Sequence, residues 1–194
     1  MSLTADYYEL KELARLVRAE NGLTSTRVLQ TDLRRIYFKH GIEIDYWPYR
    51  FKSLRGAFLY DELGATVMLA CNLPNDPLVF TMAHELKHYL TDRHLTVSYC
   101  DLSNADKRIE VEAEVFASEL LFPDQMFIEH MREMRVRPGA CNQETVVKLK
   151  LQTKTTLSYA GLAIKAERLG YAPRASLTRS KGWRKIEKVL RNRT

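Results

Sequence analysis

The stretch His84-Glu85-Leu86-Lys87-His88 decides how this chain is to be interpreted. Its two histidines are four residues apart, so in a helix they share one face and both imidazoles can reach a single metal ion. Glu85 lies close to that face, where its carboxylate can take a proton from a water held by the metal. The stretch therefore predicts a catalytic metal site on a helix.

The flanking residues predict that helix. Asp76 is the expected N-cap and Pro77 the first helical residue. Apolar side chains then recur at three- and four-residue spacing, at Val79, Phe80, Ala83, Leu86 and Leu90. Such a stripe buries a helix against a core. Histidines that merely satisfy core or surface hydrogen bonds are the weaker interpretation.

A second predicted helix, over residues 109–122, offers a third ligand, since catalytic zinc usually takes three. It has a wide apolar face and ends before Pro123. Glu112 lies beside that face, where an unpaired carboxylate is costly, so we expect Glu112 to bind the metal. Glu110, Glu114 and Glu119 are its competitors, and we expect at least two of them on the solvated surface.

The two motifs together resemble those of the ImmA/IrrE-type zinc metallopeptidases. Residues 84–90 read HELKHYL and residues 110–123 read EVEAEVFASELLFP, where the family pattern is approximately E-x-E-A-N/D-x-F-A-x-x-L-L-x-P. By this resemblance His84, His88 and Glu112 hold one zinc ion per chain and Glu85 is the catalytic residue. Glu114 departs from the family's Asn or Asp and adds a negative charge near the site.

The same resemblance implies a cytoplasmic zinc endopeptidase of bacterial or phage origin. The implied substrate is a partner protein, a helix-turn-helix transcriptional repressor, whose cleavage derepresses stress or mobile-element genes. Two alternatives stay open: a non-proteolytic zinc-containing DNA-binding regulator, and a toxin-like metallohydrolase of a toxin–antitoxin pair. Glu85 argues against the first, because a structural zinc site has no use for a base beside an open coordination position.

Other polar groups near the motif are candidates for supporting roles. His94 and Tyr89 could stabilise the transition state, as could Lys87 and Tyr99, and the sequence does not choose among them. Asp92 could orient a ligand imidazole, although a surface carboxylate at the helix end is the simpler interpretation.

The rest of the chain predicts an α+β fold, with a mainly helical zincin-like core, a small antiparallel sheet and a helix-turn-helix-like segment. Helices over 5–20 and 25–41 precede strands over 42–46, 54–60 and 65–72, and the last strand is the candidate to pair with substrate. A helix over 124–136 follows, and then two short helices over 145–150 and 157–169. We expect a metallopeptidase core over 1–137, the helix-turn-helix-like segment over 138–171 and a basic tail over 172–194. We favour packing or partner recognition over DNA contact for the segment.

The charge of the chain lies in its tail. The net charge is +6 and the pI about 9.2, and residues 174–194 hold eight Lys or Arg against one Glu. Lys181, Arg184 and Lys185 are therefore candidate contacts to nucleic acid or a partner, with a solvated terminus as the alternative. Three cysteines without a C-x-x-C spacing indicate reduced thiols, and no apolar run reaches the roughly 20 residues of a membrane span. No signal peptide is evident, which favours a cytoplasmic location.

Overall fold

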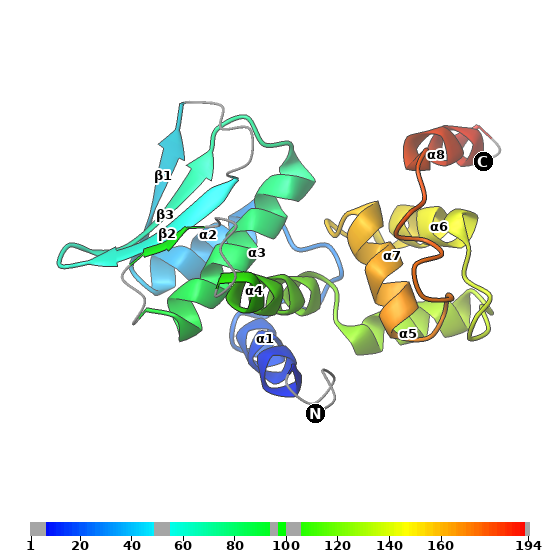
Figure 1. Ribbon diagram of the computed structural model, residues 1–194, viewed down its shortest axis with the longest axis horizontal. Helices are drawn as coiled ribbons and strands as arrows, with labels where there is room; N and C mark the ends of the chain where they lie inside the picture. The colour runs from blue at the N-terminus through cyan, green and yellow to red at the C-terminus, as the bar shows by residue number, and fades with distance from the viewer. Residues whose placement is uncertain (1–6, 49–54, 94–96, 100–105, 193–194) are drawn as a thin grey trace.

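The computed structural model describes residues 7–48, 55–93, 97–99 and 106–192, and it arranges them in two adjoining lobes (Figure 1). The N-terminal lobe holds α1 (Tyr8–Glu20), α2 (Gln30–Lys39), β1 (Ile42–Trp47), β2 (Gly56–Asp61), β3 (Gly64–Ala70), α3 (Asn75–Thr91), β4 (Val97–Tyr99) and α4 (Asp106–Leu121). The C-terminal lobe holds α5 (Asp124–Glu133), α6 (Gln143–Thr153), α7 (Tyr159–Arg168) and α8 (Trp183–Arg191). The predicted α+β fold class is confirmed.

The sheet is mixed rather than antiparallel, which corrects the prediction. Its described strands run in the order β1-β3-β2-β4, with β1 parallel to β3 and the other two pairs antiparallel. The predicted hairpin at residues 61–64 is present, and Gly64 closes it with a φ of 120°. Because the hairpin folds β3 back between β2 and β1, β3 has neighbours on both sides. The expectation that the strand over 65–72 pairs with substrate is therefore wrong, since it presents no free edge.

The core of the N-terminal lobe lies between the sheet and the helices. Helix α3 packs against β2 and β3 of the sheet and against helices α2 and α4. Its buried residues join those of the other elements in one cluster that includes Leu33, Ile36, Phe58, Val67, Leu86 and Phe116. The helix that carries both histidines is therefore the central element of the lobe.

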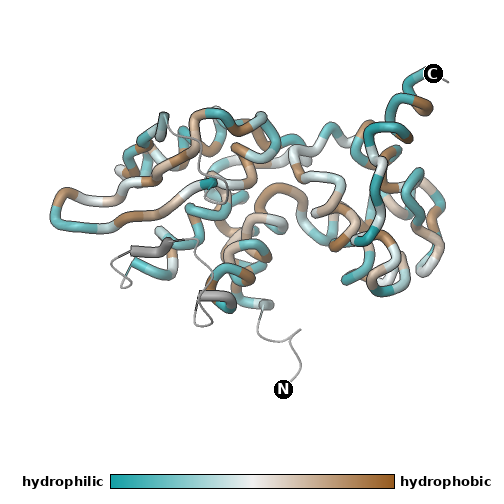
Figure 2. The backbone as a smooth tube through the Cα atoms, turned by 45° about the horizontal axis from the view of Figure 1, so that its top comes forward, coloured by the Kyte–Doolittle hydropathy of each residue, from teal (hydrophilic) through white to brown (hydrophobic). Residues whose placement is uncertain are grey.

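A second apolar cluster builds the C-terminal lobe. It begins at Phe122 and Phe127, runs through α6 and α7, and reaches Leu177. The predicted helix-turn-helix-like pair is thus present as α6 and α7, and α5 packs with it. Helix α8 buries none of its residues, and its turns alternate between hydrophilic and hydrophobic (Figure 2). The division at residues 137 and 171 stays a prediction.

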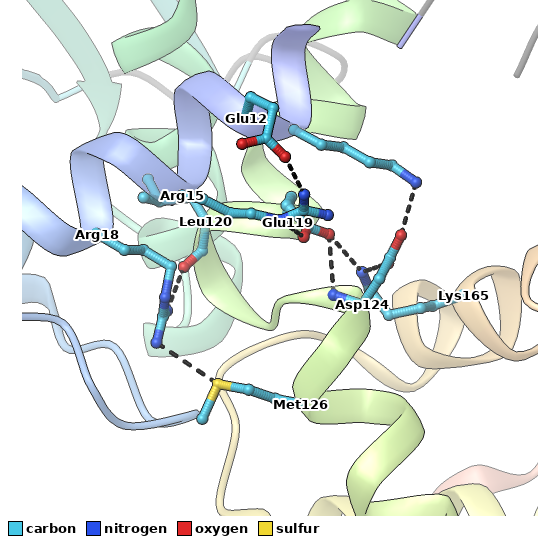
Figure 3. Close-up of polar contacts among 9 residues, drawn as sticks. Glu12, Arg15, Arg18, Glu119, Leu120, Asp124, Met126 and Lys165 are labelled. Atoms are coloured by element: carbon cyan, nitrogen blue, oxygen red, sulfur yellow. Dashed lines mark hydrogen bonds and ion pairs between the residues drawn. The ribbon is translucent and has the colours of Figure 1, made fainter. Parts of the chain in front are cut away.

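An ion cluster joins the two lobes around Glu119 of α4, whose side chain is fully buried (Figure 3). Arg15 of α1 donates to Glu119 Oε1 at 2.9 Å, and Lys165 Nζ of α7 lies 3.3 Å from Oε2. Asp124, the first residue of α5, donates its backbone N–H to Glu119 Oε2 and pairs through its carboxylate with Lys165 and Lys11. Removing one partner from such a buried cluster leaves an uncompensated charge, so the cluster holds α1, α4, α5 and α7 together.

Of the helices in the described ranges, none combines the length and apolar character that a bilayer crossing requires.

Cys71 and Cys141 are free thiols, in agreement with the expectation for these two residues. Cys100 lies outside the described residues.

The ion cluster predicts a pH dependence of stability. Burial raises the pKa of Asp124, but its pairing with Lys165 and Lys11 outweighs this and lowers the value from 3.8 to about 2. A carboxyl whose pKa is depressed in the folded state stabilises the fold above its unfolded pKa and loses that effect as the pH falls. The difference in free energy of unfolding between wild type and Asp124→Asn should therefore shrink as the pH falls from about 4 to about 2. Urea denaturation across this range measures it, and a constant difference would contradict the assignment.

Candidate metal centre

The two histidines lie on the buried side of α3. His84 and His88 are 8% and 0% exposed, and their ring centroids are 5.1 Å apart. The four-residue spacing places the rings one above the other on one helical face, as the sequence predicts. Tyr37 of α2 donates its hydroxyl to the carbonyl of Met82 at 2.6 Å, and this bond fixes α3 immediately before the motif.

Helix α4 brings a carboxylate to the pair. Glu110 Oε2 lies 3.1 Å from His84 Nε2, and Oε1 lies 3.5 Å from His88 Nε2. Ligand atoms of His84, His88 and Glu110 all lie within 4.8 Å of one another. Two imidazoles and one carboxylate are a usual ligand set of catalytic zinc sites. The donor set and its spacing therefore fit a zinc ion.

This geometry corrects the sequence prediction that Glu112 is the third ligand. The Glu112 carboxylate lies against Lys87 Nζ at 3.2 Å and Arg108 Nε at 3.0 Å instead. Residues two apart leave a helix about 200° apart, so Glu110 and Glu112 cannot both face the histidines. The sequence does contain a pattern that favours Glu110 over Glu112. Glu110 lies in a series at three- and four-residue spacing with Ala113, Ala117 and Leu121, which are fully buried, so it shares the helix face on which small side chains allow close packing.

Asp92 orients the imidazole of His88. The sequence alone favours the simpler interpretation of Asp92 as a surface carboxylate at the helix end. Its Oδ2 lies 2.7 Å from His88 Nδ1, and Lys87 Nζ donates to the same oxygen at 2.8 Å. Because a carboxylate can only accept, Nδ1 carries the proton and the lone pair of Nε2 faces Glu110. His88 Nε2 is buried and has no hydrogen-bond partner among the described residues. This tautomer is the one a metal ligand requires.

Glu85 lies at the centre of the lobe, 1% exposed, beside β2. A Cβ at Gly56 would stand 2.8 Å from Glu85 Oε1 and 2.5 Å from Thr81 Cγ2, so any side chain at this position would displace Glu85 or Thr81. The sequence gives no sign of this contact, because it joins residues of a strand and a helix far apart in the chain. Gly56, Thr81, His84, Glu85 and Glu110 line a common pocket together with Arg55, Phe80 and Glu114.

The site favours positive charge. Burial lowers the pKa of His84, but the hydrogen bond to Glu110 and the carboxylates of Glu85, Glu110 and Glu114 raise it above the ordinary 6.5. The same carboxylates would stabilise a metal cation at this position. Glu114 therefore contributes to the potential of the site, while Glu119 belongs to the ion cluster.

The remaining candidates lie elsewhere or outside the described residues. Tyr89 donates its hydroxyl to the carbonyl of His40, with the guanidinium of Arg93 4.1 Å from its ring centroid, and it does not line the pocket. His94 lies outside the described residues. Lys181, Arg184 and Lys185 are exposed in and just before α8, and their contact with nucleic acid or a partner stays a prediction.

Three comparisons with known proteins bear on this site. A family model described as the IrrE N-terminal-like domain, a peptidase family, matches residues 39–159. The curated proteins give no match. A solved structure of a Mycobacterium tuberculosis transcriptional regulator superposes with a TM-score of 0.58 at 15% sequence identity, over 89% of this chain and 50% of the other. The chain thus spans half the length of that regulator, and at this identity the likeness concerns the fold alone.

The network behind His88 predicts the effect of removing its lysine. Lys87 is 1% exposed and neutralises both Asp92 and Glu112. In the metal-free protein, Lys87→Met should reduce the free energy of unfolding by about 2–3 kcal/mol, because it leaves a buried carboxylate short of a cation. Arg108→Met removes an exposed cation from the same Glu112 and should cost less than about 0.5 kcal/mol. Urea denaturation measures both variants. Equal losses of unfolding free energy in Lys87→Met and Arg108→Met would show that Lys87 contributes no more than an exposed ion pair does.

Proposed function

The chain belongs to the family of IrrE N-terminal-like peptidase domains, and on this premise we propose that it is a zinc-dependent endopeptidase. The observation that carries the proposal is the cluster of His84, His88 and Glu110 beside the buried Glu85. His84 and His88 would hold the zinc ion through Nε2, and Glu110 would hold it through its carboxylate. The nitrogen and oxygen donors suit zinc, and the surrounding negative charge suits any divalent cation.

The chemistry divides between the metal and the protein. Zinc, when bound, supplies the Lewis acidity that activates water near neutral pH and polarises a carbonyl. Glu85 accepts the proton of the attacking water and passes it to the leaving amine. Its burial against Gly56 and Thr81 holds the carboxylate in one place. Less conformational entropy is then lost in reaching the transition state, which lowers the activation free energy. Asp92 and Lys87 keep His88 in the tautomer that binds.

The partner follows from the family resemblance of the two motifs. We propose that the substrate is a helix-turn-helix transcriptional repressor and that its cleavage derepresses stress or mobile-element genes. Reduced thiols at Cys71 and Cys141 are compatible with the cytoplasm, where we propose that the protein acts.

The ligand set is tested by metal content. We expect about one zinc ion per chain in wild type and in Glu112→Ala, and loss of zinc in His84→Ala and Glu110→Ala, since a three-ligand site loses most of its affinity with one ligand. Elemental analysis of the purified variants measures this. Glu112→Ala is the matched control, because it removes the neighbouring carboxylate of the same helix. Loss of zinc in Glu112→Ala with retention in Glu110→Ala would restore the assignment made from the sequence.

Proteolysis is tested with Glu85→Gln, which keeps the shape of the side chain and removes its basicity. The variant should bind zinc like wild type and cleave at least about 100-fold more slowly, the usual contribution of a general base. Mass spectrometry of new protein N-termini in cells that express either form measures cleavage and identifies the substrate. Equal sets of termini in the two samples would overturn the proposal, and Glu85-dependent termini outside helix-turn-helix proteins would overturn the partner. Growth arrest caused by wild type but not by Glu85→Gln would favour the toxin-like alternative.

A further inference from the structure

The pocket at the metal cluster continues into a second cavity. The first has a volume of about 150 Å³ and the second about 200 Å³. Arg55, Phe80 and Glu114 line both, so the two cavities are consecutive sections of one cleft. The second section runs between α3, α4 and α7. We call it the α7 groove.

The walls of the α7 groove are largely apolar. Pro77 and Phe80 of α3 face Leu157, Ala160 and Ile164, which lie in α7 and immediately before it. Ile164 is 38% exposed, so its aliphatic side chain is accessible from the groove. Gly161 lets Leu157 approach, because a Cβ there would meet Leu157 Cδ1 at 2.8 Å. The groove can therefore accept an aliphatic side chain.

The exposed face of α7 is unsuited to nucleic acid. A helix that enters the major groove of DNA usually presents several polar or basic side chains, mainly Arg, Lys, Asn, Gln, Ser or Thr, to the bases and phosphates. Here that face carries Ala160, Ile164 and one cation, Arg168. Lys165, the other cation of α7, is 5% exposed and faces Glu119 and Asp124. The second helix of the helix-turn-helix-like pair is therefore better suited to an apolar ligand.

The two walls of the groove are held at a fixed distance. Lys165 ties α7 to α4 and α5 through the ion cluster. Lys150 Nζ lies 2.8 Å from Asp76 Oδ2 of α3 and donates to the carbonyls of Thr155 and Leu157, which fixes the turn before α7. A preformed groove loses little conformational entropy when a ligand binds.

We propose that the α7 groove binds the substrate polypeptide next to the scissile bond and takes an aliphatic side chain between Phe80 and Ile164. This rests on the proposed function, because Glu85 and the metal cluster define the catalytic end of the cleft. A polypeptide is the occupant because the groove opens from that end, and a chain cleaved there must continue along it. Glu114, Ser118 and Arg168 provide polar groups for the peptide backbone along the rim.

The test uses the full-length, zinc-loaded Glu85→Gln protein as bait for a random-peptide phage library. The selected peptides should share an aliphatic residue at one position, and Ile164→Glu in the same background should weaken their affinity by about tenfold or more, because it places a charge in the apolar wall. Val189→Glu is the matched control, since Val189 is an aliphatic residue of α8 that is 44% exposed and lies away from the cleft. Ile164→Ala enlarges the groove and should shift the selected side chain toward larger residues. This milder variant keeps the inference testable if Ile164→Glu does not fold. Circular dichroism and zinc content verify each protein.

The outcomes separate the inference from the proposed function. Failure to select peptides, or equal affinities for the Ile164→Glu and Val189→Glu variants, would overturn the α7 groove as a substrate site. The selected peptides are then offered to zinc-loaded wild type. Peptides that depend on Ile164 for binding but are not cleaved would refute the endopeptidase and leave the groove in place. Peptides cleaved equally well by wild type and Ile164→Glu would support the endopeptidase and refute the groove.

Discussion

The buried carboxylate of Glu119 fixes the rotation of α4, and the site depends on that rotation. A charge that is fully out of water must meet its partners, and these are Arg15 of α1 and Lys165 of α7. Glu110 precedes Glu119 by nine residues, which corresponds to about 180° around the helix. While Glu119 faces α1 and α7, Glu110 is therefore directed to the opposite side, toward His84 and His88 of α3. One buried ion cluster thereby orients the proposed metal ligand about 13 Å away along the helix axis.

The same cluster makes the C-terminal lobe part of the peptidase. Lys165 lies on α7, so the ion pair that positions α4 also positions the helix that forms the far wall of the cleft. Thr26 of the loop before α2 donates to the carbonyl of Thr153 at the end of α6, and Thr156 of the turn after α6 donates to the carbonyl of Val28 in that loop. A helix-turn-helix-like pair held in this way contributes its surface to the cleft beside the candidate metal centre, and the proposed substrate site rests on this placement.

The parts of the structure that the sequence predicts are those set by local spacing. The four-residue spacing of His84 and His88, the apolar stripe of α3 and the turn at residues 61–64 are all local patterns, and each is present as predicted. The choice between Glu110 and Glu112 is different, because both carboxylates contact α3, Glu110 at His84 and Glu112 at Lys87, and only the packing of the two helices decides which one meets the histidines. The parallel pairing of β1 with β3 and the contact of Gly56 with Glu85 join distant segments, and no local pattern carries them. The contact of Asp92 with His88 can be predicted from local spacing, since Asp92 follows His88 by four residues.

Helix α4 presents Glu110, and not Glu112, to the two histidines. Anomalous diffraction from crystals of the zinc-loaded protein, recorded on both sides of the zinc absorption edge, tests it directly. If Glu110 is the third ligand, one peak will lie about 2.0–2.2 Å from His84 Nε2, His88 Nε2 and a Glu110 oxygen, with Glu112 still paired to Lys87. A peak coordinated by Glu112, or one remote from the two histidines, would contradict it.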